Sequence, residues 1–214
     1  MKYKLIILMV FILNCSSSMI YGQFEEPIEF EEKRIIKVSM YTLVHIFTPA
    51  FQFSYEKEYR KDRAWQLDVG YINDLNYGVW DERLNGFRAR FELRKYRHNF
   101  KQLRYYHGFA LQTKQTFAQN EQWVSRYNQS YSEILEYNRW TASVGGFFVH
   151  GFQSNFENNN MVIDFGMVYG LRLMHRQYFD FPNDAELIES PIGFRSGWHF
   201  FPTAFPVLKF GVAI

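Results

Sequence analysis

The chain has 214 residues, and its 24 Lys and Arg nearly balance its 22 Asp and Glu, which gives a formal net charge of +2. So small a charge provides no basic field for nucleic acid, and we predict no nucleic-acid partner. The mean hydropathy of −0.32 is too polar for a helical membrane protein, yet aromatic residues make up 20% of the chain, a high fraction for a soluble domain.

The first 22 residues have the three parts of a secretory signal peptide. Lys2 and Lys4 form a charged start, Leu5–Leu13 is a short apolar run, and the small residue Gly22 offers a cleavage point. About nine apolar residues are too few to span a bilayer as a helix. We therefore predict an exported protein whose signal peptide, residues 1–22, is removed near Gly22.

The only cysteine, Cys15, lies inside this segment. The alternative is a lipoprotein, in which Ile12–Cys15 is the lipidation box. With cleavage near Gly22, the mature chain has no disulfide, thiolate nucleophile or cysteine-ligated metal. Residues 23–34 carry five glutamates and are expected to form a flexible acidic leader, followed by one domain over residues 35–214.

Strand patterns begin after the leader. In 86–96, apolar residues occupy every odd position from Phe87 to Leu93, and charged residues occupy every even position from Arg88 to Arg94. A period of two places the apolar side chains on one face of a strand and the charged ones on the other. The same split recurs along the chain and predicts eight strands, at 35–44, 51–58, 64–73, 86–96, 105–118, 139–152, 161–174 and 203–214.

These strands have about the 9–11 residues that a tilted membrane strand needs. Short connections alternate with longer ones, as in outer-membrane barrels with periplasmic turns and extracellular loops. The expected turns are 59–63, 97–104 and 153–160, the last with a tight Asn158–Asn160 turn, and the expected loops are 45–50, 74–85, 119–138 and 175–202. Aromatic and aliphatic residues recur at helical spacing in 121–137, which predicts either a short helix or an extension of the flanking strands. The segment 192–201 fits a loop or the upper part of the last strand.

We predict an all-β fold, an eight-stranded antiparallel up-and-down transmembrane β-barrel. A periplasmic lipocalin-like barrel would also alternate, with its apolar residues inside. Charges of both signs on one face favour lipid outside, because they can neutralise each other in a narrow interior. The predicted interior network consists of Asp68, Arg88, Arg90, Glu92, Arg94, Lys114, Arg139, Asp164, Arg172 and Lys209. The predicted lipid-facing residues are Phe53, Leu67, Phe87, Phe91, Leu93, Phe165, Leu171 and Phe210.

Four segments resemble a known family: Phe53–Lys57, Gly86–Tyr96, Tyr106–Phe109 and Leu208–Val212. They are similar to small outer-membrane β-barrel proteins that are grouped as a domain of unknown function and share the architecture of the OmpA/OmpX barrels. The similarity covers about residues 35–214 through short motifs. It implies a fold and a location in the outer membrane of a Gram-negative bacterium, and no activity.

The sequence offers little chemistry. The six histidines include no close pair at metal-ligand spacing. His150, Ser154 and Glu157 are residue types that lipid A deacylases, barrels of similar architecture, use on their lipid-facing wall. Ser154 falls in the expected turn 153–160, however, and the spacing differs from that family's motif. We therefore predict no catalytic residue, no cofactor and no metal ligand.

The expected function is that of an integral outer-membrane protein with a closed interior and a structural, adhesive or complex-forming role. The arginines of 88–94 fit a salt-bridged plug better than an anion channel, since eight strands leave room only for side chains. The expected partners are outer-membrane lipid and other envelope proteins, reached through loops 74–85, 119–138 and 175–202. The alternatives are a lipid-modifying enzyme and a soluble periplasmic lipid-binding barrel.

Overall fold

The computed structural model describes residues 32–40, 50–73, 83–98, 103–126, 131–156, 160–182, 185–187 and 196–214. Residues 1–31 form a separate unit that lies outside the described residues, so the signal peptide, Cys15 and most of the acidic leader stay predictions. Within the described ranges, no helix is both long enough and apolar enough to cross a bilayer.

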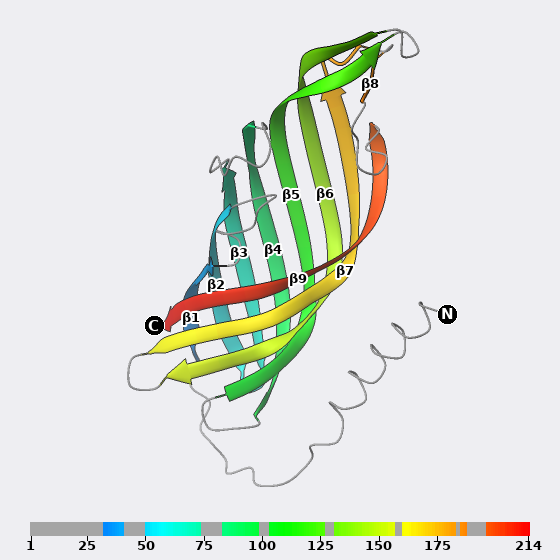
Figure 1. The fold of residues 1–214 in the computed structure, drawn as a ribbon. Helices are drawn as coiled ribbons and strands as arrows, with labels where there is room; N and C mark the ends of the chain where they lie inside the picture. Colours follow the sequence, from blue (N-terminus) through cyan, green and yellow to red (C-terminus); the bar gives the residue numbers. More distant parts are fainter. Residues whose placement is uncertain are drawn as a thin grey trace, which may run out of the picture. The chain divides into compact units, whose positions relative to one another are not determined.

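The second unit, residues 32–214, is built from antiparallel strands (Figure 1). In chain order they are β1 (Arg34–Ser39), β2 (Ala50–Arg60), β3 (Arg63–Asn73), β4 (Arg83–His98), β5 (Leu103–Arg126), β6 (Tyr131–Phe156), β7 (Met161–Phe179), β8 (Ala185–Leu187) and β9 (Gly197–Ala213). Each predicted strand corresponds to one of these elements, and β8 is additional.

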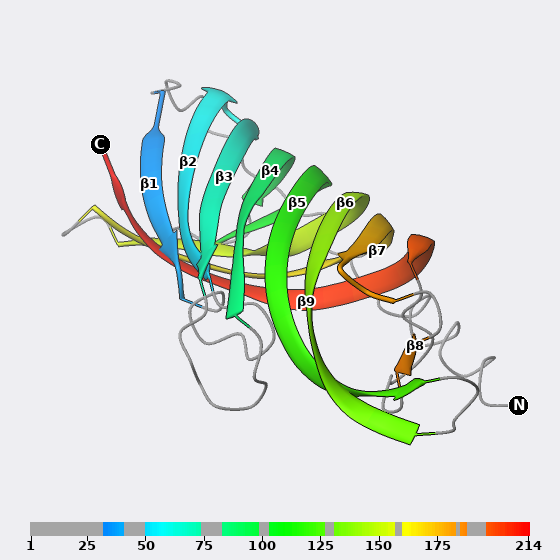
Figure 2. The same cartoon turned by 90° about the horizontal axis from the view of Figure 1, so that it is seen from above.

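Eight strands close into a ring. Each strand from β1 to β7 pairs with its neighbour in the chain, β7 pairs with β9, and β9 pairs with β1 (Figure 2). The short β8 stands outside the ring and pairs with Val124–Arg126 of β5. The predicted eight-stranded up-and-down barrel is confirmed.

The two ends of the ring differ. At the turn end, Lys61 and Asp62 connect β2 to β3, Asn160 precedes β7, and Arg34 lies opposite Lys57. Asn160 has a φ of 52°, the left-handed conformation that Asn tolerates, as predicted for that turn. Residues 99–102 and 157–159 of the other two expected turns lie outside the described ranges.

At the opposite end, which we call the hairpin end, β5 and β6 extend furthest (Figure 1). Their pairing continues to Arg126 and Tyr131, whereas the pairing of β4 with β5 stops at Gln119. The expected loop 119–138 is therefore wrong, because all of its described residues belong to strands. Of the two alternatives for 121–137, the strand extension is correct over the described residues.

Three other expected loops are also shorter than predicted. Ala50 belongs to β2, residues 83–85 belong to β4, and β7 continues to Phe179. The stretch 197–201 is the first part of β9, although Pro202 and Pro206 follow it. Both prolines occupy positions in a 16-residue pairing with β7, so the hydrophobic alternation outweighs the loss of two backbone donors here.

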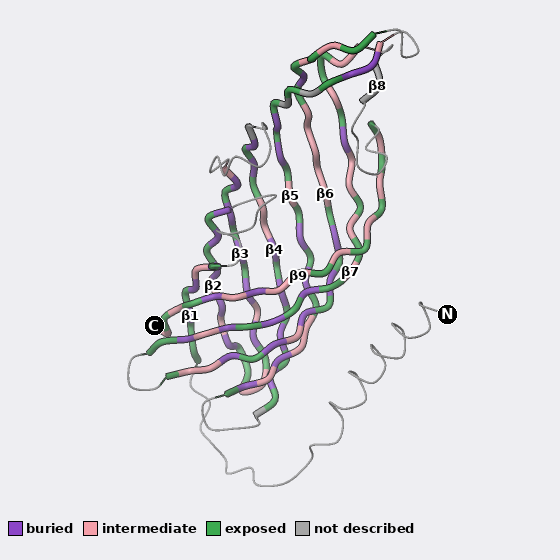
Figure 3. Tube along the Cα trace, viewed as in Figure 1, coloured by how far each residue is buried: buried purple, intermediate pink, exposed green. Residues whose placement is uncertain are grey.

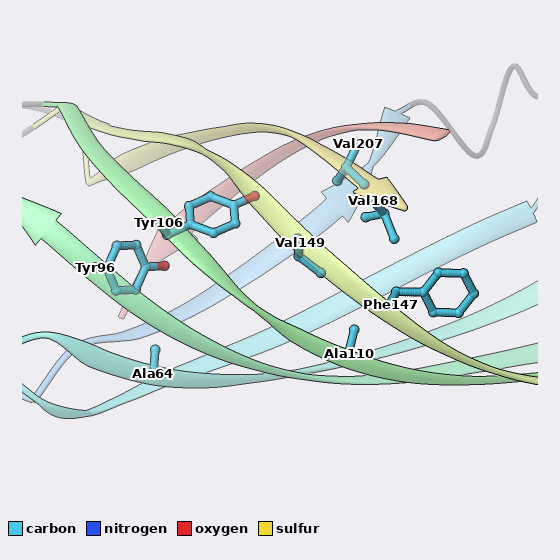
Figure 4. Close-up of a cluster of buried hydrophobic side chains, with 8 residues drawn as sticks. All are labelled: Ala64, Tyr96, Tyr106, Ala110, Phe147, Val149, Val168 and Val207. Atoms are coloured by element: carbon cyan, nitrogen blue, oxygen red, sulfur yellow. The ribbon is translucent and has the colours of Figure 1, made fainter. Parts of the chain in front are cut away.

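Burial alternates along the strands (Figure 3). Inward-facing side chains include an apolar cluster in which Phe147, Val149, Val168 and Val207 pack with Ala110, close to the tyrosines Tyr96 and Tyr106 (Figure 4). The sequence patterns did not predict this cluster.

Two glycines make room for Tyr106. Gly151 of β6 and Gly166 of β7 lie opposite each other in register. A Cβ atom on either would lie only 2.7 Å from the Tyr106 hydroxyl oxygen, and the one on Gly166 would also lie 2.7 Å from a backbone carbonyl. The small residues therefore determine where this large ring can lie.

Candidate functional site

A network of charged side chains crosses the interior of the barrel near its turn end. Its first centre is the Asp68 carboxylate of β3, which is 1% exposed. Arg90 Nη2 lies 2.6 Å from Asp68 Oδ2, and Lys209 Nζ lies 2.9 Å from both carboxylate oxygens. Gln66 Nε2 donates to Oδ1 at 2.7 Å and Gln52 Nε2 donates to Oδ2 at 3.1 Å. One carboxylate thus joins its own strand to side chains of β2, β4 and β9.

The second centre is the pair of carboxylates of Glu56 and Asp164. Lys37 Nζ lies 2.7 Å from one oxygen of each, and Arg94 Nη1 lies 3.0 Å from Glu56 Oε2 and 2.7 Å from Asp164 Oδ2. Arg94 Nε also donates to Glu92 Oε1 at 2.5 Å, and Glu92 Oε2 lies 3.5 Å from Arg90, so the two centres are connected. All these side chains are buried.

Neutral groups complete the network. The Tyr96 hydroxyl lies 2.7 Å from Glu56 Oε1 and from Gln153 Oε1, and the Tyr106 hydroxyl donates to Asp164 Oδ1 at 2.6 Å. The Arg94 guanidinium stacks 4.1 Å from the centre of the Tyr106 ring. A buried charge is tolerated only when it is paired and hydrogen-bonded, and these contacts supply both.

A further ion pair lies nearer the turn end. Arg104 of β5 binds Glu58 of β2 across the interior, and its guanidinium lies 4.0 Å from the centre of the Tyr96 ring. The strands that supply the network therefore surround it on all sides, and every ring strand except β6 contributes a charged group. β6 contributes Gln153, which accepts from Lys37 at 3.2 Å.

The structure brings together six of the ten residues predicted for the interior: Asp68, Arg90, Glu92, Arg94, Asp164 and Lys209. The other four, Arg88, Lys114, Arg139 and Arg172, also occupy inward-facing positions, but nearer the hairpin end and only partly buried. A small cavity lined by Ser39, Gln52, Arg88, Arg90 and Gln112 lies between the two groups.

Sequence analysis assigned Glu56 to the polar face, but it did not assign several other members of the network: Lys37, Glu58, Tyr96, Arg104, Tyr106 and Gln153. For most of them the signal was present. Tyr96 continues the even-numbered series that contains Arg94, and Tyr106 continues the series that contains Ala110. Lys37 was harder to assign, because Ile35 on the same face is apolar and buried.

The outer surface carries the opposite residue types. The eight predicted lipid-facing residues all lie on it and are exposed, from 40% for Phe210 to 65% for Phe87. Aromatic rings form rows across neighbouring strands. The Phe109 and Phe148 ring centres are 4.4 Å apart, and Tyr169 stacks on Phe148 at 5.9 Å. Phe87, Phe91 and Leu93 point outward, which is the reverse of the lipocalin-like alternative.

The candidate deacylase residues do not form a site. Ser154 lies within β6, not in a turn as predicted, and His150 lies on the same strand. The two residues are four positions apart along the strand, a distance of about 13 Å, which is too far for a hydrogen bond between serine and histidine. Glu157 lies outside the described residues.

The structure also pairs two histidines that are distant in sequence. His107 of β5 lies directly opposite His150 of β6 on the outer surface. Tyr105 and Tyr169 flank them, with ring centres 6.1 Å from His107 and 5.5 Å from His150 respectively. Within the described part of the chain, no three His, Cys, Asp or Glu side chains come together as metal ligands.

No protein-family model and no curated protein matches this chain. Among solved structures, a major outer membrane protein from Thermus thermophilus is similar over 86% of this chain and 100% of its own, with 10% sequence identity and a TM-score of 0.40. A similarity at this level says nothing about what the chain does. The family resemblance of the sequence motifs stays a prediction.

Proposed function

We propose that the chain is an integral β-barrel protein of the outer membrane of a Gram-negative bacterium, closed by an internal ion-pair network. The observation that carries the proposal is the reversal of the usual soluble pattern: Phe87 is 65% exposed, whereas Lys37 and Lys209 are fully buried. A soluble barrel would bury the Phe87 side chain and expose the ammonium groups of Lys37 and Lys209 to water.

The outer surface fits hydrocarbon. Exposed Phe, Leu, Ile and Val side chains recur on every ring strand, and soluble monomers rarely expose such contiguous apolar patches. In lipid, a barrel also satisfies every backbone donor and acceptor, because a closed ring has no edge. The pairing of β1 with β9 completes that ring.

The strand lengths agree with a bilayer. β2 and β3 each have 11 residues. At about 3.3 Å per residue and a tilt of about 40°, such a strand rises roughly 28 Å, similar to the apolar band of outer-membrane barrels. Lys57 and Lys95 lie on the outer face close to the turn end, where a long side chain can reach the headgroups.

The filled interior supports a closed barrel that anchors the protein in the membrane and displays a hairpin outside it. The network of Asp68, Glu56 and Asp164 with their basic partners occupies the interior at the turn end, and Tyr96 and Tyr106 pack against it. The long β5–β6 hairpin extends beyond the ring at the other end. We infer a structural, adhesive or complex-forming role in which the barrel holds this hairpin at the cell surface.

Fractionation tests the location, and gel mobility tests the fold. The protein should require detergent for extraction from outer-membrane fractions. It should also migrate faster on SDS gels before boiling than after, since folded outer-membrane barrels resist SDS until they are heated. A chain found in the soluble periplasmic fraction, with the same mobility before and after boiling, would contradict the proposal.

A further inference from the structure

The charges inside the barrel separate into two halves. In the half nearer the turn end, five buried carboxylates (Glu56, Glu58, Asp68, Glu92 and Asp164) accompany five buried cations (Lys37, Arg90, Arg94, Arg104 and Lys209). Beyond Asp68, as far as the pairing of Gln119 with Asn138, no inward-facing residue that the structure describes is acidic. The half nearer the turn end is therefore balanced in charge, whereas the inward-facing described residues of the other half include no negative charge.

Five cations occupy the half nearer the hairpin end. We call Arg88, Lys114, Arg139, Arg172 and Arg176 the basic vestibule. Arg88 of β4 lies directly opposite Lys114 of β5, and Lys114 lies opposite Ser143 of β6. Arg172 of β7 lies opposite Gly145 of β6. Four adjacent strands thus present positive charge to one space.

Lys114 lies among the other cations of the basic vestibule. Its ammonium is repelled by Arg88, Arg139 and Arg172. No residue in the described ranges accepts a hydrogen bond from it or pairs with it. Like charges directly opposite each other on neighbouring strands destabilise a sheet. Arg88, Arg139 and Arg176 have further interactions of their own, but these leave the repulsion at Lys114 in place.

The vestibule is accessible and has a polar floor. Arg88, Lys114, Arg139 and Arg172 are partly exposed, in contrast to the fully buried cations of the network. Below them, Gln52, Gln112 and Ser39 line the small cavity that separates the vestibule from the Asp68 centre. A ligand that enters from the hairpin end therefore meets cations on its sides and neutral polar side chains beneath.

Guanidinium groups and an ammonium together favour a particular ligand chemistry. Arginine binds the oxygens of phosphate in a bidentate manner, and lysine adds a mobile point charge. A doubly charged oxyanion offers two oxygens to one guanidinium and further oxygens to its neighbours, whereas chloride offers a single atom with half the charge. We propose that the basic vestibule binds a phosphate group, carried either by a free phosphate ion or by a lipid headgroup, and that Lys114 is a principal contact.

The experiment titrates the purified full-length barrel in detergent with sodium phosphate by calorimetry, at constant ionic strength maintained with sodium chloride. A second titration uses short-chain phosphatidic acid, with short-chain phosphatidylcholine as the zwitterionic comparison. Lys114→Met should weaken phosphate binding about tenfold, as expected for the loss of one charge-assisted hydrogen bond. Lys114→Arg should restore most of it.

The matched control is Lys61→Met, which removes the same charge from the turn at the opposite end. It should bind phosphate as the parent protein does. Folding of every variant is checked by its gel mobility before boiling. A second readout is stability without any anion, which Lys114→Met should leave equal or raise, because it removes a repelled charge.

Binding of phosphate and phosphatidic acid with similar affinity supports a site for the phosphate ion itself. Binding of phosphatidic acid alone supports a site for a lipid headgroup. If neither binds, or if Lys114→Met and Lys61→Met weaken binding equally, the proposal is wrong. The phosphate titration needs the closed barrel but no bilayer, so its failure is distinguishable from a failure of the membrane location.

Discussion

Lys37 Nζ lies 2.7 Å from Asp164 Oδ2, although the two residues are 127 positions apart and neither side chain is exposed. Lys37 belongs to β1 and Asp164 to β7, and both strands pair with β9, one on each side. The ion pair therefore spans the place where the last strand closes the ring. It connects closure of the barrel to neutralisation of its interior charge.

Removing one partner of this pair should destabilise the barrel strongly. Asp164→Asn keeps the shape of the side chain but leaves Lys37 and Arg94 with less negative charge, and we expect a loss of about 3–5 kcal/mol in the free energy of unfolding. Lys37→Met should cost a similar amount. The double variant should cost clearly less than the sum, because it leaves no unpaired charge between them. Urea unfolding of the barrel in lipid vesicles measures all three.

The control for these three variants is an ion pair of the same type that is exposed to solvent. Lys57 lies 2.9 Å from Glu32 at the turn end, and its ammonium lowers the pKa of the Glu32 carboxyl. Because this pair is solvated, Lys57→Met should change the free energy of unfolding by less than about 1 kcal/mol. Equal effects of Lys37→Met and Lys57→Met would show that the buried network has no special role in stability.

The space reserved for Tyr106 gives a second prediction. Gly166→Ala would place a Cβ 2.7 Å from the Tyr106 hydroxyl and 2.7 Å from a backbone carbonyl, so we expect a loss of about 1–3 kcal/mol. Gly146→Ala is the matched control, since a Cβ there meets nothing within 4 Å. It should change stability by less than about 0.5 kcal/mol. Parallel urea titrations compare the two, and equal losses would refute the packing role.

The hairpin that extends beyond the ring should be dispensable for folding. Asn120 lies opposite Tyr137, so an Asn-Gly turn can replace 121–136 without a change of register. Because β4 pairs with β5 only up to Gln119 and β7 pairs with β6 only from Asn138, the shortened protein loses only hairpin pairs and keeps those that close the ring. We expect the same fast gel mobility before boiling. Loss of that mobility would mean that the hairpin takes part in folding the barrel.

The interior network should block ion flow. An eight-stranded barrel is only wide enough for side chains, and here the ion pairs, Tyr96 and Tyr106 occupy it at the turn end. The protein inserted in planar lipid bilayers should give no stable conductance steps. Reproducible steps with selectivity for anions would instead identify the arginines of β4 as part of a channel.

The sequence predicted the strands well where apolar and charged residues alternate without interruption. In β4, Phe87 to Leu93 and Arg88 to Arg94 define both the strand and its two faces, and the structure gives the same faces. The predicted strand ends were less accurate. In 121–137, Trp123, Ile134 and their neighbours follow a spacing that fits a helix as well as a strand, and only the cross-strand pairing of β5 with β6 decides between them.

The partners within the network were beyond sequence analysis for a physical reason. Alternation assigns Asp68 and Asp164 to the inner face, but it does not specify which cation lies opposite in a closed ring. That choice depends on strand order and register, which bring Lys209 to Asp68 across 141 positions. Phe147 and Val168 were missed because they are apolar residues on the inner face, where the pattern predicted polar ones.

The location of the outer face in hydrocarbon is tested most directly by collision of spin labels. A nitroxide is attached at Phe91→Cys, and for comparison at Lys61→Cys in the turn, in a Cys15→Ser background reconstituted into lipid vesicles. The label at position 91 should collide often with dissolved oxygen and rarely with a water-soluble nickel chelate, and the label at position 61 should do the reverse. If the label at position 91 meets the nickel chelate as readily as the label in the turn, the apolar surface faces water, and the protein is not a membrane barrel.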